Sequence, residues 1–245
     1  KGQRGEKNKL LNLTIGEKAQ FERLLVQKER DIEQIRSQIF LLEGAGISMP
    51  LSKAYEIASF ASKKTGVRPA FLLAVLKQES SWGSNVGQCF LVDKETGTGK
   101  GKNTGSSYTR TMKVSRDIQP FFQITQELGR DPYNTLVSCP HPDYGYGGAM
   151  GPAQFLPSTW MGYRDEVANL LGHTPDPWDL YDSFTASALK LSRGGATEQS
   201  PDVEWKAAMI YYAGSRWNNP VYSFYGDSVM ELAAAIQQEI EAMGG

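Results

Sequence analysis

Helical periodicity dominates the sequence from Leu51 onward and constrains the fold more than any other feature. Apolar and small residues recur at spacings of three and four, and Pro69 suits a first helical turn, where its missing N–H has no helical partner. Strand signals are sparse, and the Gly/Thr/Lys-rich stretch 90–114 is the best place for a small hairpin. The pattern predicts a mainly α fold with little or no β-sheet and helices over 51–64, 69–83, 115–129, 158–171, 179–193, 203–213 and 227–243.

Residues 17–43 form a different segment. Its apolar residues alternate in steps of four and three with one polar interruption, at Phe21, Leu25, Lys28, Ile32, Ile35, Ile39 and Leu42. This heptad seam predicts a coiled coil that pairs chains or docks a helix of the same chain, and the alternative is one amphipathic helix lying on the main domain. A Gly/Pro breaker at 44–50 sets the boundary. We therefore predict an N-terminal segment over 1–47 and a main domain over 48–245, with an insertion at about 88–143.

Charge and hydropathy narrow the class of protein. The 245 residues carry 26 Lys and Arg against 27 Asp and Glu, a balance that gives no general attraction to nucleic acid. No apolar run approaches the roughly 20 residues of a membrane-spanning helix. Because the chain begins at Lys1 without a signal-peptide pattern, we expect any export signal or anchor to lie outside it.

Cys89 and Cys139 are the only cysteines. They allow one disulfide, which would indicate an oxidising compartment, or two unpaired buried thiols, and spacing alone leaves both open. A metal site made with His141 and His173 is less favoured, because the spacing from Cys139 to His141 is not a zinc pattern.

Glu79 lies near the end of the apolar segment "FLLAVLKQESSWGSNVG" (71–87). It follows Leu72, Val75 and Leu76 by seven, four and three residues, so in a helix it shares their face. A carboxylate on a face that should be buried is either paired elsewhere or functional.

Two further segments carry candidate site residues. In "YGYGGAMGPAQFLPSTW" (144–160), glycines allow close backbone approach and Gln154 can recognise hydroxyl and amide groups. In "YYAGS" (211–215), Tyr211 and Tyr212 end a helix, and a tyrosine hydroxyl can orient a nearby carboxylate. Taken singly, each segment is more commonly a tight structural loop or a core tyrosine.

In this order the segments "QESSWGSNVG", "GAMGPAQFLPSTW" and "YYAGS" resemble the motifs of the lytic murein transglycosylases, which have a lysozyme-like domain. The sequence of the second segment, with "DPWDLYDSFTASALKL" (176–191) after it, is similar to that of the B-type membrane-bound members. The long insertion between the first and second segments is a further similarity to them. The resemblance covers about 50–230 and implies an enzyme outside the cytoplasm, in the periplasm or cell wall, that acts on peptidoglycan.

The resemblance also implies roles for individual residues. Glu79 would be the catalytic acid/base, Ser80 and Gln154 would belong to the binding groove, and Tyr211 would hydrogen-bond near Glu79. The chain departs from the family pattern in having Tyr212 in place of an Asn and Gly145 in place of a Ser. Tyr144, Tyr146 or Tyr212 are the candidates to replace those polar contacts, and the two tyrosines of the Gly-rich segment are candidates to stack on sugars.

The family mechanism needs one carboxylate. A second would have to be Asp93, Asp117 or Asp143, and nothing in the sequence marks any of them. The expected reaction gives 1,6-anhydro-muramic ends with no cofactor. The stretch 165–179 lacks the acid spacing of a calcium loop, so no calcium is expected. The alternatives are a hydrolytic, goose-lysozyme-like muramidase and a non-catalytic peptidoglycan-binding scaffold that acts through its coiled coil.

Overall fold

The computed structural model describes residues 18, 20, 49–83, 86–141 and 145–244. The chain divides into the units Lys1–Ile47 and Ser48–Gly245. Lys18 and Gln20 are helical, but the rest of the predicted coiled coil lies outside the described residues and stays a prediction. No helix in the described part of the chain has the length and apolar character needed to span a membrane.

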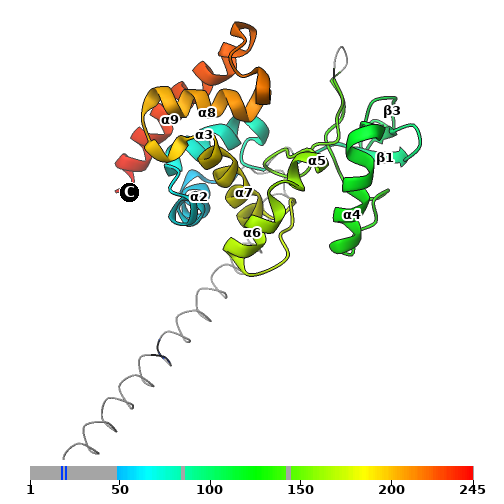
Figure 1. Cartoon of the computed structure of the whole chain (residues 1–245), viewed down its shortest axis with the longest axis horizontal. Helices are drawn as coiled ribbons and strands as arrows, with labels where there is room; N and C mark the ends of the chain where they lie inside the picture. The colour runs from blue at the N-terminus through cyan, green and yellow to red at the C-terminus, as the bar shows by residue number, and fades with distance from the viewer. Residues whose placement is uncertain (1–17, 19, 21–48, 84–85, 142–144, 245) are drawn as a thin grey trace, which may run out of the picture. The chain divides into compact units, whose positions relative to one another are not determined.

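The core of the second unit is built around α3 (Pro69–Ser80). Its residues from Ala70 to Leu76 are all fully buried, as expected of a helix that is apolar on every side and surrounded by others. Around it pack α2 (Leu51–Thr65), α7 (Leu180–Arg193) and α9 (Ser223–Ala242), and α9 also contacts α8 (Pro201–Ala213) (Figure 1). The prediction of a mainly α fold is confirmed.

Helix α3 ends at Ser80, three residues before the Gly83 that the sequence favoured. The chain leaves the helix through Ser81 and Trp82, which have positive φ angles of 52° and 58°. Two contacts hold this turn: the Trp82 indole donates to the Leu73 carbonyl at 2.9 Å, and Ser80 Oγ accepts the Gly83 N–H at 2.9 Å. Buried side-chain contacts therefore fix the end of the helix that carries Glu79.

The insertion holds a small antiparallel sheet in the order β1 (Cys89–Asp93), β2 (Thr98–Gly101) and β3 (Ser107–Tyr108). These strands lie almost entirely within the stretch 90–114, where the sequence favoured a small hairpin. A π-helical turn (Val114–Ile118) and α4 (Gln119–Glu127) follow the sheet where one helix was predicted. The sheet and α4 lie on the opposite side of this unit from α8 and α9 (Figure 1).

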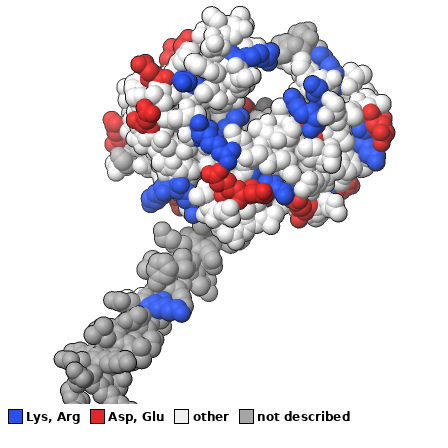
Figure 2. All heavy atoms as spheres, in the orientation of Figure 1, with Lys and Arg blue, Asp and Glu red and all other residues white. Residues whose placement is uncertain are grey.

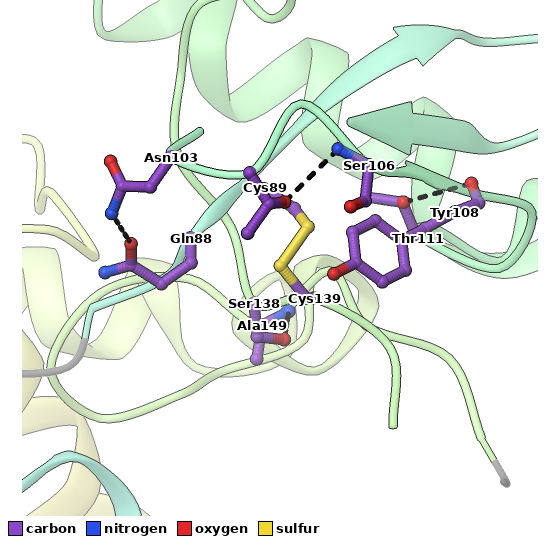
Figure 3. The surroundings of a disulfide bond; sticks show 10 residues. Gln88, Cys89, Asn103, Ser106, Tyr108, Thr111, Ser138, Cys139 and Ala149 are labelled. Carbon is purple, nitrogen blue, oxygen red and sulfur yellow. Dashed lines mark hydrogen bonds between the residues drawn. A yellow bond between two sulfur atoms is a disulfide. The ribbon is translucent and has the colours of Figure 1, made fainter. Parts of the chain in front are cut away.

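A disulfide joins Cys89 and Cys139 with a Cα–Cα distance of 5.1 Å, which decides between the alternatives left open by their spacing (Figure 3). Beside it, Cys89 and Val137 exchange backbone hydrogen bonds of 3.0 and 2.9 Å. The two ends of the insertion are thus tied together at its base.

Two more of the predicted helices differ clearly from the structure in their bounds. The segment predicted as one helix over 158–171 is divided into α5 (Pro157–Trp160) and α6 (Arg164–Leu171). The last helix begins four residues before Asp227, whose carboxylate accepts a hydrogen bond from the Trp205 indole at 2.8 Å instead of capping the helix. Short 3₁₀ turns at Ala196–Glu198, Gly214–Arg216 and Pro220–Tyr222 complete the described elements.

Candidate functional site

Glu79 is partly buried in the last turn of α3. Its Oε1 accepts a hydrogen bond of 2.5 Å from the hydroxyl of Tyr225, which comes from the first turns of α9 and is 3% exposed. The packing of α9 on α3 brings these two residues together across 146 positions of sequence. The Glu79 carboxyl is therefore held by a neighbour that the motifs did not indicate.

Burial raises the pKa of Glu79, because removal from water disfavours the charged form. The Tyr225 hydrogen bond and the positive charge of Lys190 act in the opposite direction, and burial is the larger effect. Burial and the Glu79 charge together raise the pKa of Tyr225, so that its hydroxyl remains a donor. The site favours a carboxyl that keeps its proton to higher pH than an ordinary glutamate.

Lys190 reaches this site from α7. Its ammonium lies 3.7 Å from the centroid of the Tyr211 ring and donates to the Tyr211 carbonyl at 3.1 Å. Burial lowers the pKa of Lys190 to about 8, and the Glu79 charge partly opposes that shift. A half-buried cation therefore accompanies the carboxyl.

Replacing Lys190 by Met is expected to raise the pKa of Glu79 further, because the variant keeps much of the side-chain volume and loses the positive charge. The measurement is a ¹³C NMR titration of the Glu79 carboxyl in the two proteins. Lys64→Met is the matched control, since Lys64 also lies over an aromatic ring (Phe60, 4.9 Å) and donates to a carbonyl (Leu170, 2.8 Å). An unchanged or lowered Glu79 pKa in Lys190→Met would contradict the electrostatic assignment.

Tyr211 is buried, and its hydroxyl donates to the Ala153 carbonyl at 3.0 Å and pairs with Ser187 Oγ at 3.0 Å. Burial raises the pKa of Tyr211, and the charge of the nearby Glu79 carboxylate adds to that rise. The expected hydrogen bond near Glu79 nevertheless comes from Tyr225, and Tyr211 instead anchors the Gly-rich segment through Ala153.

The Gly-rich segment forms a tight turn that presents Gln154. Met150 and Phe155 pair across it with a backbone hydrogen bond of 2.9 Å, and Gln154 has a positive φ of 51°. The Gln154 side-chain amide donates to the Gly151 carbonyl at 2.8 Å. A Cβ at Gly151 would lie 1.9 Å from the Pro177 carbonyl oxygen, so only glycine fits there. The turn is therefore closely fitted to the segment before α7.

The remaining candidates have different surroundings. Ser80 is buried, and its hydroxyl shapes the turn after α3. Gly145 has a φ of 75°, which the Ser of the family pattern would adopt only with strain. Tyr146 is exposed, and Tyr144 lies outside the described residues. Their binding roles stay predictions.

Tyr212 is exposed, with its ring stacked on that of Tyr225 at a centroid distance of 4.5 Å and an interplanar angle of 16°. The residue in place of the family's Asn thus packs against the tyrosine that bonds Glu79. Figure 2 shows that the surface of this unit is hollowed on the face drawn, with Lys and Arg side chains beside the hollow.

Within the described ranges, no three His, Cys, Asp or Glu side chains come together as a metal ion would require. A pocket of about 290 Å³ is lined by residues of α4, α5 and α6, and its Arg164 and Glu127 already pair at 2.5 Å. None of the residues around Glu79 lines it.

A family model and several solved structures match this chain. The family model described as "Transglycosylase SLT domain" matches residues 45–201. Among solved structures, the Escherichia coli lytic transglycosylase SLT35, in a complex with calcium, is similar with a TM-score of 0.53 and 16% identity, covering 77% of this chain and 72% of that one. The same enzyme in complex with bulgecin A gives 0.52 and 17%, with 77% and 71% covered.

The catenated lytic transglycosylase SltB1 from Pseudomonas aeruginosa gives a TM-score of 0.53 and 16% identity, with 77% and 75% of the two chains covered. At these identities the structures establish a shared fold. No protein with a curated description matches the sequence. Since the family model spans well over half of the chain, the protein belongs to the transglycosylase SLT domain family.

Proposed function

We propose that this enzyme cleaves the β-1,4 bond between N-acetylmuramic acid and N-acetylglucosamine in peptidoglycan, with Glu79 as its single catalytic acid/base and 1,6-anhydro-muramic ends as its product. The observation that carries the proposal is the Glu79 carboxyl, partly buried at the end of α3 with its pKa raised and bonded by the Tyr225 hydroxyl. Such a carboxyl can hold a proton for a leaving oxygen near neutral pH.

The surroundings of the other candidate acids support a single-carboxylate mechanism. Asp93 is engaged in its own turn by the Thr96 hydroxyl at 2.7 Å, and the hydrogen bonds there lower its pKa. Asp117 is buried against Arg116 at 2.6 Å and the Ser158 hydroxyl at 2.6 Å. Both acids have structural partners, and Asp143 lies outside the described residues.

The proposed reaction uses the substrate's own groups in place of a second acid. Glu79 donates its proton to the glycosidic oxygen while the acetamido oxygen of N-acetylmuramic acid bonds to C1, so the leaving sugar departs with a new hydroxyl. The Glu79 carboxylate then removes the proton from the C6 hydroxyl of the same muramic acid. O6 bonds to C1 as the acetamido oxygen leaves, which closes the 1,6-anhydro ring without water.

In this proposal Ser80 and Gln154 belong to the binding groove, and Tyr144 and Tyr146 are sugar-stacking candidates. The positive φ of Gln154 and its internal bond to Gly151 support a side chain held in one orientation for substrate. Because the substrate is cell-wall material, the enzyme would act outside the cytoplasm. The heptad seam over 17–43 would join two chains or hold a protein partner.

Digestion of purified peptidoglycan by this chain is expected to give products that end in 1,6-anhydro-muramic acid. Mass spectrometry separates these from reducing ends, which are heavier by one water. Reducing ends would indicate the hydrolytic muramidase instead. Binding to peptidoglycan with no released fragments would indicate the scaffold and would overturn the proposal.

A further inference from the structure

A partly exposed aromatic cluster lies one ring away from the Glu79 carboxyl. It consists of Tyr212 at the end of α8, Tyr222 in the 3₁₀ turn before α9, and Phe224 in the first turn of α9. We call these three residues the aromatic platform. Tyr212 lies at the centre, with edge-to-face contacts of 5.8 Å to each of the other two rings.

The platform is open to solvent in spite of its apolar character. Tyr212 is 44% exposed and Phe224 is 55% exposed, and Tyr222 is half-buried. Single exposed apolar residues are ordinary, but contiguous exposed rings on a folded domain are typical of a binding surface. The contacts among the rings hold each in a fixed orientation, so little side-chain freedom would be lost on binding.

The inner edge of the platform is joined to the site already described. Tyr212 stacks on Tyr225 at 4.5 Å, and the Tyr225 hydroxyl donates to Glu79 at 2.5 Å. The Tyr225 ring therefore separates the platform from the carboxyl, so the platform lies close to the candidate site without touching Glu79. The platform ring that stacks on Tyr225 belongs to Tyr212, the residue at which the chain departs from the family's Asn.

We propose that Tyr212, Tyr222 and Phe224 form a sugar-binding subsite that takes the apolar face of an N-acetylated pyranose ring, one or more sugars from the bond that is cleaved. The proposal rests on the proposed function, because the position of the platform close to Glu79 indicates a glycan as the ligand. Aromatic rings suit this ligand, since they offer a broad apolar face to the C–H groups of a sugar ring. An occupied platform would fix the strand without contacting the reacting atoms.

The test is binding and turnover in Phe224→Ala. Tri-N-acetylchitotriose is titrated by calorimetry into proteins that also carry Glu79→Gln, and Phe224→Ala is expected to weaken binding about tenfold. On peptidoglycan, with Glu79 intact, Phe224→Ala should raise KM by a similar factor and leave kcat nearly unchanged. The reason is that the lost contact stabilises the bound substrate and the transition state equally. Phe224→Tyr, which keeps the ring, should restore both values.

Tyr133→Ala is the matched control, since Tyr133 is 43% exposed and makes an edge-to-face contact of 5.6 Å with Phe122 in the insertion. It should leave chitotriose binding and KM unchanged. Unchanged binding and KM in Phe224→Ala would overturn the platform while leaving the proposed function intact. A fall in kcat alone would also overturn it, by showing that the rings act only by supporting Tyr225. Loss of the proposed function would be recognised separately, by the absence of cleavage in the unaltered protein.

Discussion

Replacing Glu79 by Gln is expected to lower peptidoglycan cleavage about 10²–10⁴-fold, the range that a general acid–base group contributes. Gln has no proton of suitable acidity to give the glycosidic oxygen, and it cannot take the proton from the C6 hydroxyl. Its side-chain oxygen can still accept the Tyr225 hydroxyl, so the packing of α3 against α9 should be kept. Release of soluble fragments from purified peptidoglycan measures the loss.

The same variant is expected to melt at a higher temperature than the parent at pH 7. The pKa of Glu79 is raised in the folded state, so the fold is most stable when this group is protonated and loses stability as the pH rises through the folded-state pKa. Gln removes this loss of stability because it carries no charge. We expect the melting temperature to rise by a few degrees, the size typical when a functional carboxyl is neutralised. The gain should disappear below the ordinary Glu pKa of about 4.3, where the parent carboxyl is protonated in both states.

Glu56→Gln is the control for both measurements, because Glu56 is exposed and its ion pair with Lys53 joins neighbouring turns of α2. It should change neither cleavage nor the pH dependence of melting. Undiminished cleavage in Glu79→Gln would remove Glu79 from the mechanism. If the melting temperatures of Glu79→Gln and the parent differ by the same amount from about pH 4 to pH 8, the ionised Glu79 carboxylate does not destabilise the fold.

The helical part of the site could be read from the sequence because it depends on local periodicity. The face shared by Leu72, Val75 and Leu76 predicted that Glu79 would be set among buried residues, and all three are fully buried. The sequence did not indicate Tyr225, because the last helix was predicted to begin at Asp227. Its spacing of four before Val229 places it on the same buried stripe, so a helix extended by one turn would have included it.

Other features depend on contacts between distant segments, which periodicity does not encode. The approach of Lys190 to Glu79 requires that α7 and α3 pack in one particular register. The Tyr211 hydroxyl lies 58 positions from the carbonyl it bonds in the Gly-rich turn. The family resemblance pointed to Tyr211 near Glu79, whereas the packing of α9 on α3 brings the Tyr225 hydroxyl to the carboxyl.

Loss of the disulfide is the second large effect we expect. The bond closes a loop with a sequence separation of 50, and the entropy it removes from the unfolded chain corresponds to about 4 kcal/mol of stability. The double variant Cys89→Ala/Cys139→Ala should therefore melt about 8–16 °C below the parent, on the scale of about 2–4 °C per kcal/mol for a chain of this size. Calorimetric melting measures the shift.

Reducing agent provides the matched control, since it should lower the melting temperature of the parent by a similar amount and leave that of the double variant unchanged. A shift of less than about 2 °C in the variant would mean that the bond adds almost nothing to the stability of the fold. A shift in the variant without one in the reduced parent would assign the effect to the substituted side chains and not to the crosslink.

The loss should also reach the candidate site, because the base of the insertion continues directly into the Gly-rich segment (Figure 3). The Ser138 N–H donates to the Ala149 carbonyl at 2.8 Å, and the Ser138 hydroxyl oxygen accepts the Ala149 N–H at 3.0 Å. The Gly148 N–H donates to the Ser138 carbonyl at 2.9 Å. Loss of the disulfide at the adjacent Cys139 would free these hydrogen-bonded residues to move, and with them the turn that presents Gln154. Cleavage by the double variant should therefore decline at temperatures where its helices are still folded. Activity and circular dichroism, followed on the same samples, measure the two losses. Loss of both signals at the same temperature would show that the disulfide supports the fold only as a whole.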